Sequence, residues 1–373
     1  MAEEGRKTGD CALVLGATGL VGRHLVQLVT QRYPNVKLTL LDKKPPSIAY
    51  CSQTHCSAFQ NHEFIQADPA KPAAIQNAFA NKTYNYVFNL TLDTIPLNQT
   101  EQVYDEIIVQ ASKRAAQVAA ENNVQRFIDL STALVYEASS KPSRESSTTK
   151  PWTKLAAAKL RAEEVLRAAA STTKMHVVIL RAAVIYGPGD INGQISGRIL
   201  CGAAYRQLGE GMRLLWDGDM RFSTVHASDV AAAAWHVASL HLPAREYNLA
   251  DPGCSTQRSI GEALEGLLGI RISYLGKVAT RAALALGLRG FADAANNKHL
   301  KPWSDLCDVS GIQSSPLTPF IDPELLAYYK HISVDGSAVC STGFAYSVTK
   351  LTAETLREQV RYWQELGIFP QID

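Results

Sequence analysis

The sequence has 373 residues, of which 46% are hydrophobic and 19% are charged, and its formal net charge is +2. This composition is typical of a globular protein with two or three domains. The small net charge gives no reason to expect nucleic acid or an anionic membrane surface as a partner.

The cysteines and the start of the chain predict the compartment. Seven cysteines are an odd number in a long chain, which favours reduced thiols over a disulfide framework. The polar start MAEEGRKTGD lacks the apolar core of a secretory signal. No apolar run reaches the ~18 residues that a membrane-spanning helix needs. We therefore expect a cytoplasmic protein for which membrane contact is not expected.

Short apolar runs alternate with helical patterns along the first half of the chain. Strands are predicted at 11–16, 36–42, 63–68, 84–90, 126–131 and 175–187, and helices at 20–32, 72–81, 101–122 and around Lys159. Strands separated by helices imply right-handed βαβ units and a parallel sheet, and continuously apolar strands imply that both faces of the sheet are covered. The predicted fold is α/β, with a Rossmann-type doubly wound parallel sheet.

The pattern becomes less regular after residue 190. A strand and a helix are predicted within 214–238, and helices alternate with irregular, proline-containing segments over 251–345. We predict a Rossmann dinucleotide-binding domain over 1–190, to which 222–250 returns. Residues 191–221 and 251–373 are predicted to form a smaller C-terminal α/β substrate lobe.

A glycine loop joins the first predicted strand to the first helix. Gly16, Gly19 and Gly22 have the spacing GxxGxxG. Such glycines permit a tight turn, a close approach to a pyrophosphate and close packing of helix on strand, while the helix N-terminus attracts the phosphate charge. The alternative is a glycine turn that serves packing alone. The predicted cofactor-binding residues of this loop are Gly16, Thr18, Gly19, Leu20 and Gly22.

Asp42, at the end of the second strand, lies 20 residues after Gly22. A carboxylate there accepts hydrogen bonds from ribose hydroxyls and repels a 2′-phosphate, which favours NAD over NADP. Lys43 and Lys44 follow and could instead hold a 2′-phosphate, so NADP stays open. Asp68, after the third strand, could bind the adenine amino group or cap the helix that follows.

Several further segments resemble one superfamily. GATGLVG, FIDLSTALVYE, ILRAAVIYGPGD and MRFSTVHASDVAAAA occur in this order. They resemble the cofactor loop, the fifth-strand motif and the two following motifs of extended short-chain dehydrogenases/reductases, which include sugar-nucleotide epimerases and dehydratases. Ala182 stands where proline is usual. The resemblance covers about residues 10–260 and implies a nicotinamide dinucleotide, NAD or NADP, as cofactor.

The superfamily's chemistry uses a hydroxyl residue, a tyrosine and a lysine. The resemblance places Thr132 at the hydroxyl position and Lys159 at the lysine, which binds the nicotinamide ribose and lowers the pKa of the tyrosine. Leu155 occupies the tyrosine position. Glu145, Pro151 and Glu163 match the flanking pattern and fix this register, and residues 138–185 contain no tyrosine. The standard proton transfer is therefore predicted to be missing.

Two functions remain open from the sequence. The first is an NAD(P)-binding protein with reduced or absent hydride-transfer chemistry. The second is an active oxidoreductase, epimerase or dehydratase that acts on a sugar nucleotide, a steroid or another hydroxyl or keto substrate with a displaced proton donor. Tyr136 and Tyr186 are the nearest tyrosines in sequence, although packing is the simpler role for Tyr136. Lys159 could be a solvated helix lysine.

Weaker patterns complete the prediction. The resemblance implies substrate contacts for Tyr136 and for Arg221, which matches a phosphate-binding arginine of sugar-nucleotide epimerases but could be a surface residue. Cys51, His55, Cys56 and His62 are grouped in a predicted loop, but their spacing matches no common zinc site, so no metal is predicted. An unknown small-molecule substrate is expected as a partner, and a homodimer or a larger complex stays open.

Overall fold

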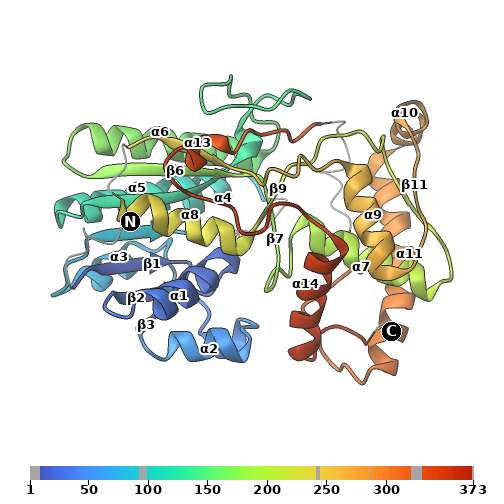
Figure 1. The fold of residues 1–373 in the computed structure, drawn as a ribbon, viewed down its shortest axis with the longest axis horizontal. Coiled ribbons are helices and arrows are strands. Elements are labelled where there is room, and N and C mark those ends of the chain that lie inside the picture. The colour runs from blue at the N-terminus through green and yellow to red at the C-terminus, as the bar shows by residue number, and fades with distance from the viewer. Residues whose placement is uncertain (1–8, 92–98, 241–243, 286, 321–329, 372–373) are drawn as a thin grey trace.

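The computed structural model describes residues 9–91, 99–240, 244–285, 287–320 and 330–371. A seven-stranded sheet, in which all paired strands are parallel, has the order β10-β6-β5-β4-β1-β2-β3 (Figure 1). Its strands are β1 (Cys11–Leu15), β2 (Lys37–Asp42), β3 (Glu63–Gln66), β4 (Tyr86–Asn89), β5 (Arg126–Thr132), β6 (His176–Ala182) and β10 (Glu246–Leu249). The predicted doubly wound parallel sheet is confirmed.

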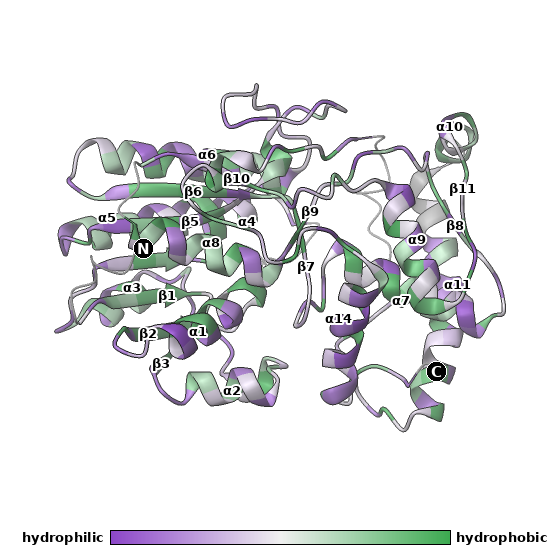
Figure 2. Cartoon of the chain, viewed as in Figure 1, coloured by the Kyte–Doolittle hydropathy of each residue, from purple (hydrophilic) through white to green (hydrophobic). Residues whose placement is uncertain are grey.

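Helices cover both faces of this sheet because its strands are apolar on both sides (Figure 2). Along β1, Ala12 and Val14 face the cluster that includes α1 (Leu20–Arg32) and α8 (Ala227–Ser239). Leu13 and Leu15 face the opposite cluster, which includes α3 (Pro72–Phe79), α5 (Ala111–Glu121) and part of α6 (Lys154–Ser171). The strand order reverses at β1, whose neighbours are β2 and β4, and this switch point is where such sheets bind ligands.

The helix predicted over 101–122 is divided into three parts. It consists of α4 (Glu101–Tyr104), the π-helical segment η3 (Asp105–Gln110) and α5. Tyr104, Ile108 and Val109 of the first two parts pack on Ala158 and Ala162 of α6. The irregular turn therefore lies against the helix that carries Leu155 and Lys159.

Most of the chain after β6 builds the right-hand part of Figure 1, while α8 and β10 return to the sheet. The helices of that part are α7 (Gln194–Gln207), α9 (Gln257–Leu268), α10 (Lys277–Ala285), α11 (Leu288–Val309) and α14 (Ala353–Glu365), whereas α13 (Ser337–Cys340) lies against β10 of the large sheet. Two small sheets pair β8 (Met212–Leu214) with β11 (Ile272–Tyr274) and β7 (Val184–Tyr186) with β9 (Thr224–His226). The predicted division into a dinucleotide-binding domain and a substrate lobe stays a prediction.

One local expectation is wrong. The segment after β2, predicted as a loop, contains the 3-10 turn η1 (Pro46–Ile48) and the helix α2 (Gln53–Phe59). Ser52 caps α2 by accepting a hydrogen bond from the backbone N–H of His55 at 3.3 Å. Among the described residues, none of the helices has both the length and the hydropathy to cross a bilayer.

Candidate cofactor-binding and active site

The glycine loop packs closely against the backbone around it at the start of α1. Gly16 has a φ of +78°, and a Cβ there would lie 2.8 Å from the carbonyl oxygen of Leu90. At Gly22 a Cβ would lie 2.1 Å from the carbonyl oxygen of Gly16. Gly19 begins α1 without a side-chain cap and without an acidic residue in the first turn. The positive end of the helix dipole at this glycine turn favours an anion, such as a pyrophosphate.

Asp42 and Thr18 connect the loop to the end of β2. Asp42 is 4% exposed, and its Oδ2 accepts a hydrogen bond from the backbone N–H of Thr18 at 3.0 Å. Its Oδ1 accepts from the backbone N–H of Lys44 at 3.3 Å. The hydroxyl of Thr18 donates to the carbonyl oxygen of Lys44 at 3.1 Å. The carboxylate thus lies beside the loop, as a ribose-binding acid would.

Lys43 and Asp68 form an ion pair with an Nζ–Oδ2 distance of 3.2 Å. Asp68 also accepts a hydrogen bond from the backbone N–H of Ala70 at 2.9 Å. Lys43 is therefore already paired with a carboxylate and would have to leave it to bind a 2′-phosphate. Asp68 also stabilises the turn before α3. Their predicted contacts with a cofactor, like those of buried Leu20, stay predictions.

Arg23 holds the glycine loop in place, a role that the sequence analysis missed. Its guanidinium is buried and donates to the carbonyl oxygens of Thr18 at 2.6 Å and Gly19 at 3.2 Å. It also donates to the carbonyl oxygen of Tyr50 at 2.8 Å and to the hydroxyl of Tyr362 in α14 at 2.9 Å. An arginine within the apolar stretch LVGRHLV was the available signal, because a buried cation needs several partners.

Leu155 and Lys159 lie on α6, but they do not form a pair that could transfer a proton. Leu155 is half-buried and packs against the cluster formed by Tyr104, Ile108 and their neighbours. Lys159 is 1% exposed, and its Nζ donates to the carbonyl oxygen of Leu130 in β5 at 2.7 Å. The lysine is therefore anchored to the sheet, and its predicted role in cofactor binding stays a prediction.

Buried polar side chains surround this lysine. Asp129 Oδ2 lies 3.9 Å from Lys159 Nζ, and Asp129 Oδ1 accepts a hydrogen bond from the Asn89 amide at 2.6 Å. The same amide lies 3.2 Å from the hydroxyl of Ser112 on α5. Burial raises the pKa of Asp129, although Lys159 and the Asn89 hydrogen bond act in the opposite direction. Asp129 interrupts an apolar strand, which is a sign in the sequence that a buried polar partner must lie nearby.

The hydroxyl-bearing residues near the site have local partners. Thr132 is 8% exposed, and its hydroxyl oxygen accepts a hydrogen bond from the backbone N–H of Leu134 at 3.2 Å. This bond caps the 3-10 turn η4 (Ala133–Val135) that follows β5. Tyr136 is 3% exposed, donates to Asn248 Oδ1 at 2.7 Å and accepts from Arg181 at 2.8 Å. Its hydroxyl belongs to a network in the core.

That network centres on the fully buried Glu163. Arg181 donates to Glu163 Oε2 at 2.6 Å, and Arg167 donates to the same oxygen at 2.8 Å. The hydroxyl of Ser131 donates to Glu163 Oε1 at 2.6 Å. The acid that supported the register of the α6 motif is thus a structural anchor between α6, β5 and β6.

The pKa of both nearby tyrosines is displaced away from the neutral range. Burial raises the pKa of Tyr136, and the positive charge of Arg181 only partly opposes this. Burial also raises the pKa of Tyr186, whose ring lies 5.3 Å from that of His226. A tyrosine that transfers a proton near neutral pH needs the opposite shift.

The remaining predicted residues lie elsewhere. Arg221 is exposed, and its Nη1 lies 3.4 Å from the carbonyl oxygen of Cys254. In the group predicted from sequence, His55 packs against Tyr362 and His62 bonds the hydroxyl of Thr30. Within the described ranges, no three His, Cys, Asp or Glu side chains are grouped so that they could hold a metal ion.

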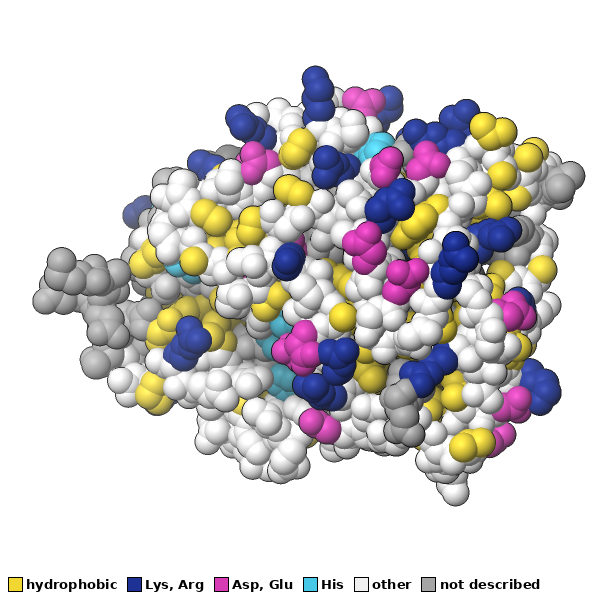
Figure 3. Space-filling view, turned by 45° about the vertical axis from the view of Figure 1, so that its right-hand side comes forward, with side chains coloured by type: hydrophobic (Ala, Val, Ile, Leu, Met, Phe, Trp, Pro, Cys, Tyr) yellow, Lys and Arg dark blue, Asp and Glu magenta, His cyan; other side chains and the backbone are white. Residues whose placement is uncertain are grey.

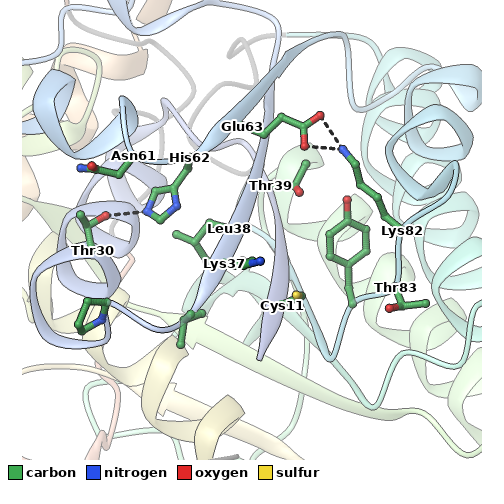
Figure 4. A pocket seen from close by; sticks show the side chains of 13 residues that line it. Cys11, Thr30, Lys37, Leu38, Thr39, Asn61, His62, Glu63, Lys82 and Thr83 are labelled. Atoms are coloured by element: carbon green, nitrogen blue, oxygen red, sulfur yellow. Dashed lines mark hydrogen bonds and ion pairs between the residues drawn. The ribbon is translucent and has the colours of Figure 1, made fainter. Parts of the chain in front are cut away.

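An open groove of about 830 Å³ lies at the other edge of the sheet (Figure 4). Its lining includes Cys11, Lys37 and Glu63, the first residues of β1, β2 and β3. Lys82 bonds Glu63 there at 2.5 Å. Because parallel α/β sheets bind ligands at the carboxyl ends of their strands, this groove is separate from the dinucleotide site.

On the face shown in Figure 3, cationic and anionic side chains are interspersed.

Residues 12–250 match the model of the NAD dependent epimerase/dehydratase family, and the chain belongs to this family. The predicted membership of the extended short-chain dehydrogenase/reductase superfamily is thereby confirmed. Human dTDP-D-glucose 4,6-dehydratase is 28% identical over 183 residues, which are 47% of this chain and 51% of that protein. The chain thus spans about half the length of the first curated relatives it matches.

Solved structures share the fold at low identity. The dTDP-glucose 4,6-dehydratase of Bacillus anthracis, in complex with NAD, has a TM-score of 0.68 and 14% identity and covers 96% of this chain and 97% of its own. The UDP-N-acetylglucosamine 4-epimerase of Methanobrevibacter ruminantium, in complex with UDP-N-acetylmuramic acid, has a TM-score of 0.69 and 19% identity and covers 96% and 99%. At identities this low, the similarity to these structures shows the shared fold and nothing about function.

Proposed function

We propose that this chain binds NAD(P) at its glycine loop and has reduced or absent tyrosine-dependent hydride transfer. The observation that carries the proposal is the glycine turn between β1 and α1 together with Leu155, which packs in an apolar cluster at the tyrosine position. A bound nicotinamide would supply hydride chemistry. Leucine has no proton to exchange with a substrate oxygen, and that loss typically costs a factor of about 10²–10⁴ in rate.

The neighbouring tyrosines support this proposal. Tyr136 uses its hydroxyl on Asn248 and Arg181, and Tyr186 is fully buried against His226. Burial raises the pKa of each hydroxyl. If Tyr136 were to act as the proton donor in place of Leu155, its buried hydrogen-bond network would have to break. If Tyr186 were to do so, its buried ring would have to become exposed. Both changes cost free energy before any chemistry starts.

The same geometry supports NAD as the preferred cofactor. Asp42 lies beside the loop with its carboxylate already bonded to the N–H of Thr18. A 2′-phosphate placed there would face this carboxylate at close range, and Lys43, the nearest cation in sequence, is paired with Asp68. We propose that NAD binds more tightly than NADP.

The second candidate is an active oxidoreductase, epimerase or dehydratase with a displaced proton donor. Membership of a family named for such enzymes favours it. A sugar nucleotide would be its first substrate class, because the similar solved structures include a UDP-N-acetylglucosamine 4-epimerase and a dTDP-glucose 4,6-dehydratase, and a human dTDP-D-glucose 4,6-dehydratase is among the curated relatives. Arg221, exposed beside the Cys254 carbonyl group, would then be a phosphate contact.

Calorimetric titration with NAD and NADP tests the first proposal. We expect saturable binding of NAD that Gly22→Ala abolishes, because the new Cβ would lie 2.1 Å from a carbonyl oxygen. Gly290→Ala is the matched control, since a Cβ at that helical position meets nothing within 4 Å. Absence of any heat with either dinucleotide would refute the proposal.

Absorbance at 340 nm distinguishes the two candidates. NAD-saturated protein mixed with sugar nucleotides or hydroxysteroids is expected to form no NADH above the background. Epimerases and dehydratases regenerate their cofactor, so the substrate mixture is also analysed by chromatography for new products. Turnover that disappears with Lys159→Ala would favour the second candidate.

A further inference from the structure

One buried hydroxyl joins the C-terminal helix to the region of the glycine turn. Tyr362, on α14, accepts hydrogen bonds from the Arg23 guanidinium and from the backbone N–H of Ser52, each at 2.9 Å. It donates to the carbonyl oxygen of Tyr50 at 2.9 Å. Arg23 and Tyr362 are 339 residues apart in the chain. In Figure 1, α14 belongs to the right-hand part of the molecule and α1 and α2 belong to the left-hand part, so this hydroxyl connects the two.

Arg23 extends this connection to the glycine turn itself. Its guanidinium donates to the carbonyl oxygen of Thr18 at 2.6 Å and to that of Gly19 at 3.2 Å. It also donates to the carbonyl oxygen of Ala49 at 2.9 Å. A peptide unit is planar, so holding a carbonyl oxygen fixes the orientation of the whole unit. Arg23 thus fixes the peptide planes at the start of α1, and Tyr362 helps to hold Arg23.

The backbone of Tyr50 is held by the same two side chains. Its φ is +53°, a left-handed conformation that residues other than glycine rarely adopt. Such a conformation persists where the surrounding structure maintains it, and it is frequent at functional sites. The carbonyl oxygen of Tyr50 accepts hydrogen bonds from Arg23 at 2.8 Å and from Tyr362 at 2.9 Å. Loss of the Tyr362 hydroxyl would therefore loosen both Tyr50 and Arg23.

The helix α14 is also fixed to the segment that leads from β7 into α7. Gln359 donates to the hydroxyl of Ser196 at 2.7 Å, and Trp363 donates to the carbonyl oxygen of Asp190 at 2.9 Å. All four of these side chains are buried. The docking of α14 therefore depends on this segment and on the hydroxyl that reaches the glycine turn.

We propose that Tyr362 is a positioning residue for the dinucleotide turn and that the docking of α14 regulates the affinity of this turn for NAD. Tyr362 acts through Arg23, which holds the carbonyl oxygens of the turn. The inference rests on the proposed function, because the same turn is proposed to bind the dinucleotide. Coupling between two sites is reciprocal, so bound NAD in turn stabilises the docked helix.

Tyr362→Phe tests the positioning role, because it removes the hydroxyl and keeps the ring. We expect the NAD dissociation constant of the folded variant, measured by calorimetry, to rise about fivefold or more. Tyr346→Phe is the matched control, since the Tyr346 hydroxyl bonds the N–H of Ala250 and the carbonyl oxygen of Gly336, each at 3.2 Å. Both variants are expected to lower the melting temperature. Equal NAD affinities of the two variants would overturn the inference.

The route through Arg23 has its own test. A lysine lacks the planar fork with which Arg23 bonds the glycine turn and the Tyr362 hydroxyl together. Arg23→Lys is expected to weaken NAD binding, and adding Tyr362→Phe to it is expected to change the affinity little further. Losses of affinity that multiply in the double variant would overturn this route.

Hydrogen exchange of the natural chain tests the coupling without any variant. Saturating NAD is expected to slow the exchange of the amide hydrogens of α14. Exchange in α14 that bound NAD leaves unchanged would overturn the inference alone. Absence of NAD binding by the natural chain would overturn the proposed function and this inference with it, so the two failures are distinguishable.

Discussion

The ammonium group of Lys159 lies 3.9 Å from Oδ2 of Asp129, and both side chains are fully buried. This distance is too long for a hydrogen bond, so the pair interacts through charge while Lys159 bonds the Leu130 carbonyl oxygen. A buried pair of this kind stabilises little by itself, but removing one partner leaves an uncompensated charge.

Asp129→Asn is therefore expected to destabilise the fold by about 3–5 kcal/mol, because Lys159 keeps its charge in the core. The double variant Asp129→Asn/Lys159→Met is expected to recover part of that loss, since neither charge remains. Urea denaturation of the natural chain, Asp129→Asn, Lys159→Met and the double variant measures the coupling between the two residues. Additive losses in the double variant would show that the two charges do not interact.

Glu163→Gln is expected to cost a similar amount, about 3–5 kcal/mol. Glu163 is fully buried and accepts hydrogen bonds from Arg181, Arg167 and Ser131, so an amide there loses the charge that both arginines need. The neighbouring Glu164 is exposed, and Glu164→Gln is the matched control. The unfolding free energies of the two variants, measured in urea, should differ by several kcal/mol. Equal values would contradict the role of this network.

Two histidines near the glycine loop predict weaker folding at acid pH. Burial lowers the pKa of His55 to about 2 and that of His24 to about 3, and their rings lie 5.1 Å apart. The unfolded chain takes up protons below pH ~6.5 while these folded-state histidines stay neutral, so stability falls as the pH falls. Each contributes about 2 kcal/mol of loss by pH 5.

His55→Gln isolates one of these contributions. Burial raises the pKa of Asp251 to about 6, which acts in the opposite sense between pH 6 and 4, so the comparison uses differences from the natural chain. The variant's unfolding free energy should fall less steeply between pH 6.5 and 5, by about 1.4 kcal/mol per pH unit. His176→Gln, at an exposed position, is the control. Parallel profiles for all three proteins would contradict a neutral buried His55.

Asp42→Asn is expected to narrow the difference between NAD and NADP. The variant keeps one acceptor for the N–H of Thr18 but loses the charge that repels a 2′-phosphate. We expect NAD affinity to fall by about tenfold and NADP affinity to rise, because a charge-assisted hydrogen bond is worth about 1.5–3 kcal/mol. Calorimetry with both dinucleotides measures the ratio. An unchanged ratio of the NAD and NADP affinities would show that a residue other than Asp42 sets the preference for NAD.

The sequence predicted the sheet and the glycine loop because their signals are local. Gly16, Gly19 and Gly22 follow an apolar run, and Asp42 follows the next one, so spacing alone indicates their places. The helix α2 was missed because QTHCSAF has no apolar period, although Ser52 was a capping signal. β7 and β9 lie within segments where strands were predicted, 175–187 and 214–238, whereas β8 and β11 have three residues each, which is too short for a periodic signal.

The environment of the site could not be predicted in the same way. The motif places Lys159 on α6, but its orientation depends on Asp129 and Leu130, which come from β5. Arg23 likewise meets Tyr362 from the other end of the chain. Polar residues inside apolar strands showed that buried partners had to exist. Which partners they are follows only from the packing of α6 and α14.

A crystal structure of the protein with NAD tests the central claim, that dinucleotide binding here is separate from tyrosine-dependent hydride chemistry. The account predicts the pyrophosphate at the start of α1 and the adenosine ribose at Asp42. It also predicts that Lys159 stays on the Leu130 carbonyl oxygen and that no tyrosine hydroxyl lies beside the nicotinamide ring. A ribose bonded to Lys159, with a tyrosine hydroxyl within hydrogen-bond reach of the substrate space at the ring, would contradict it.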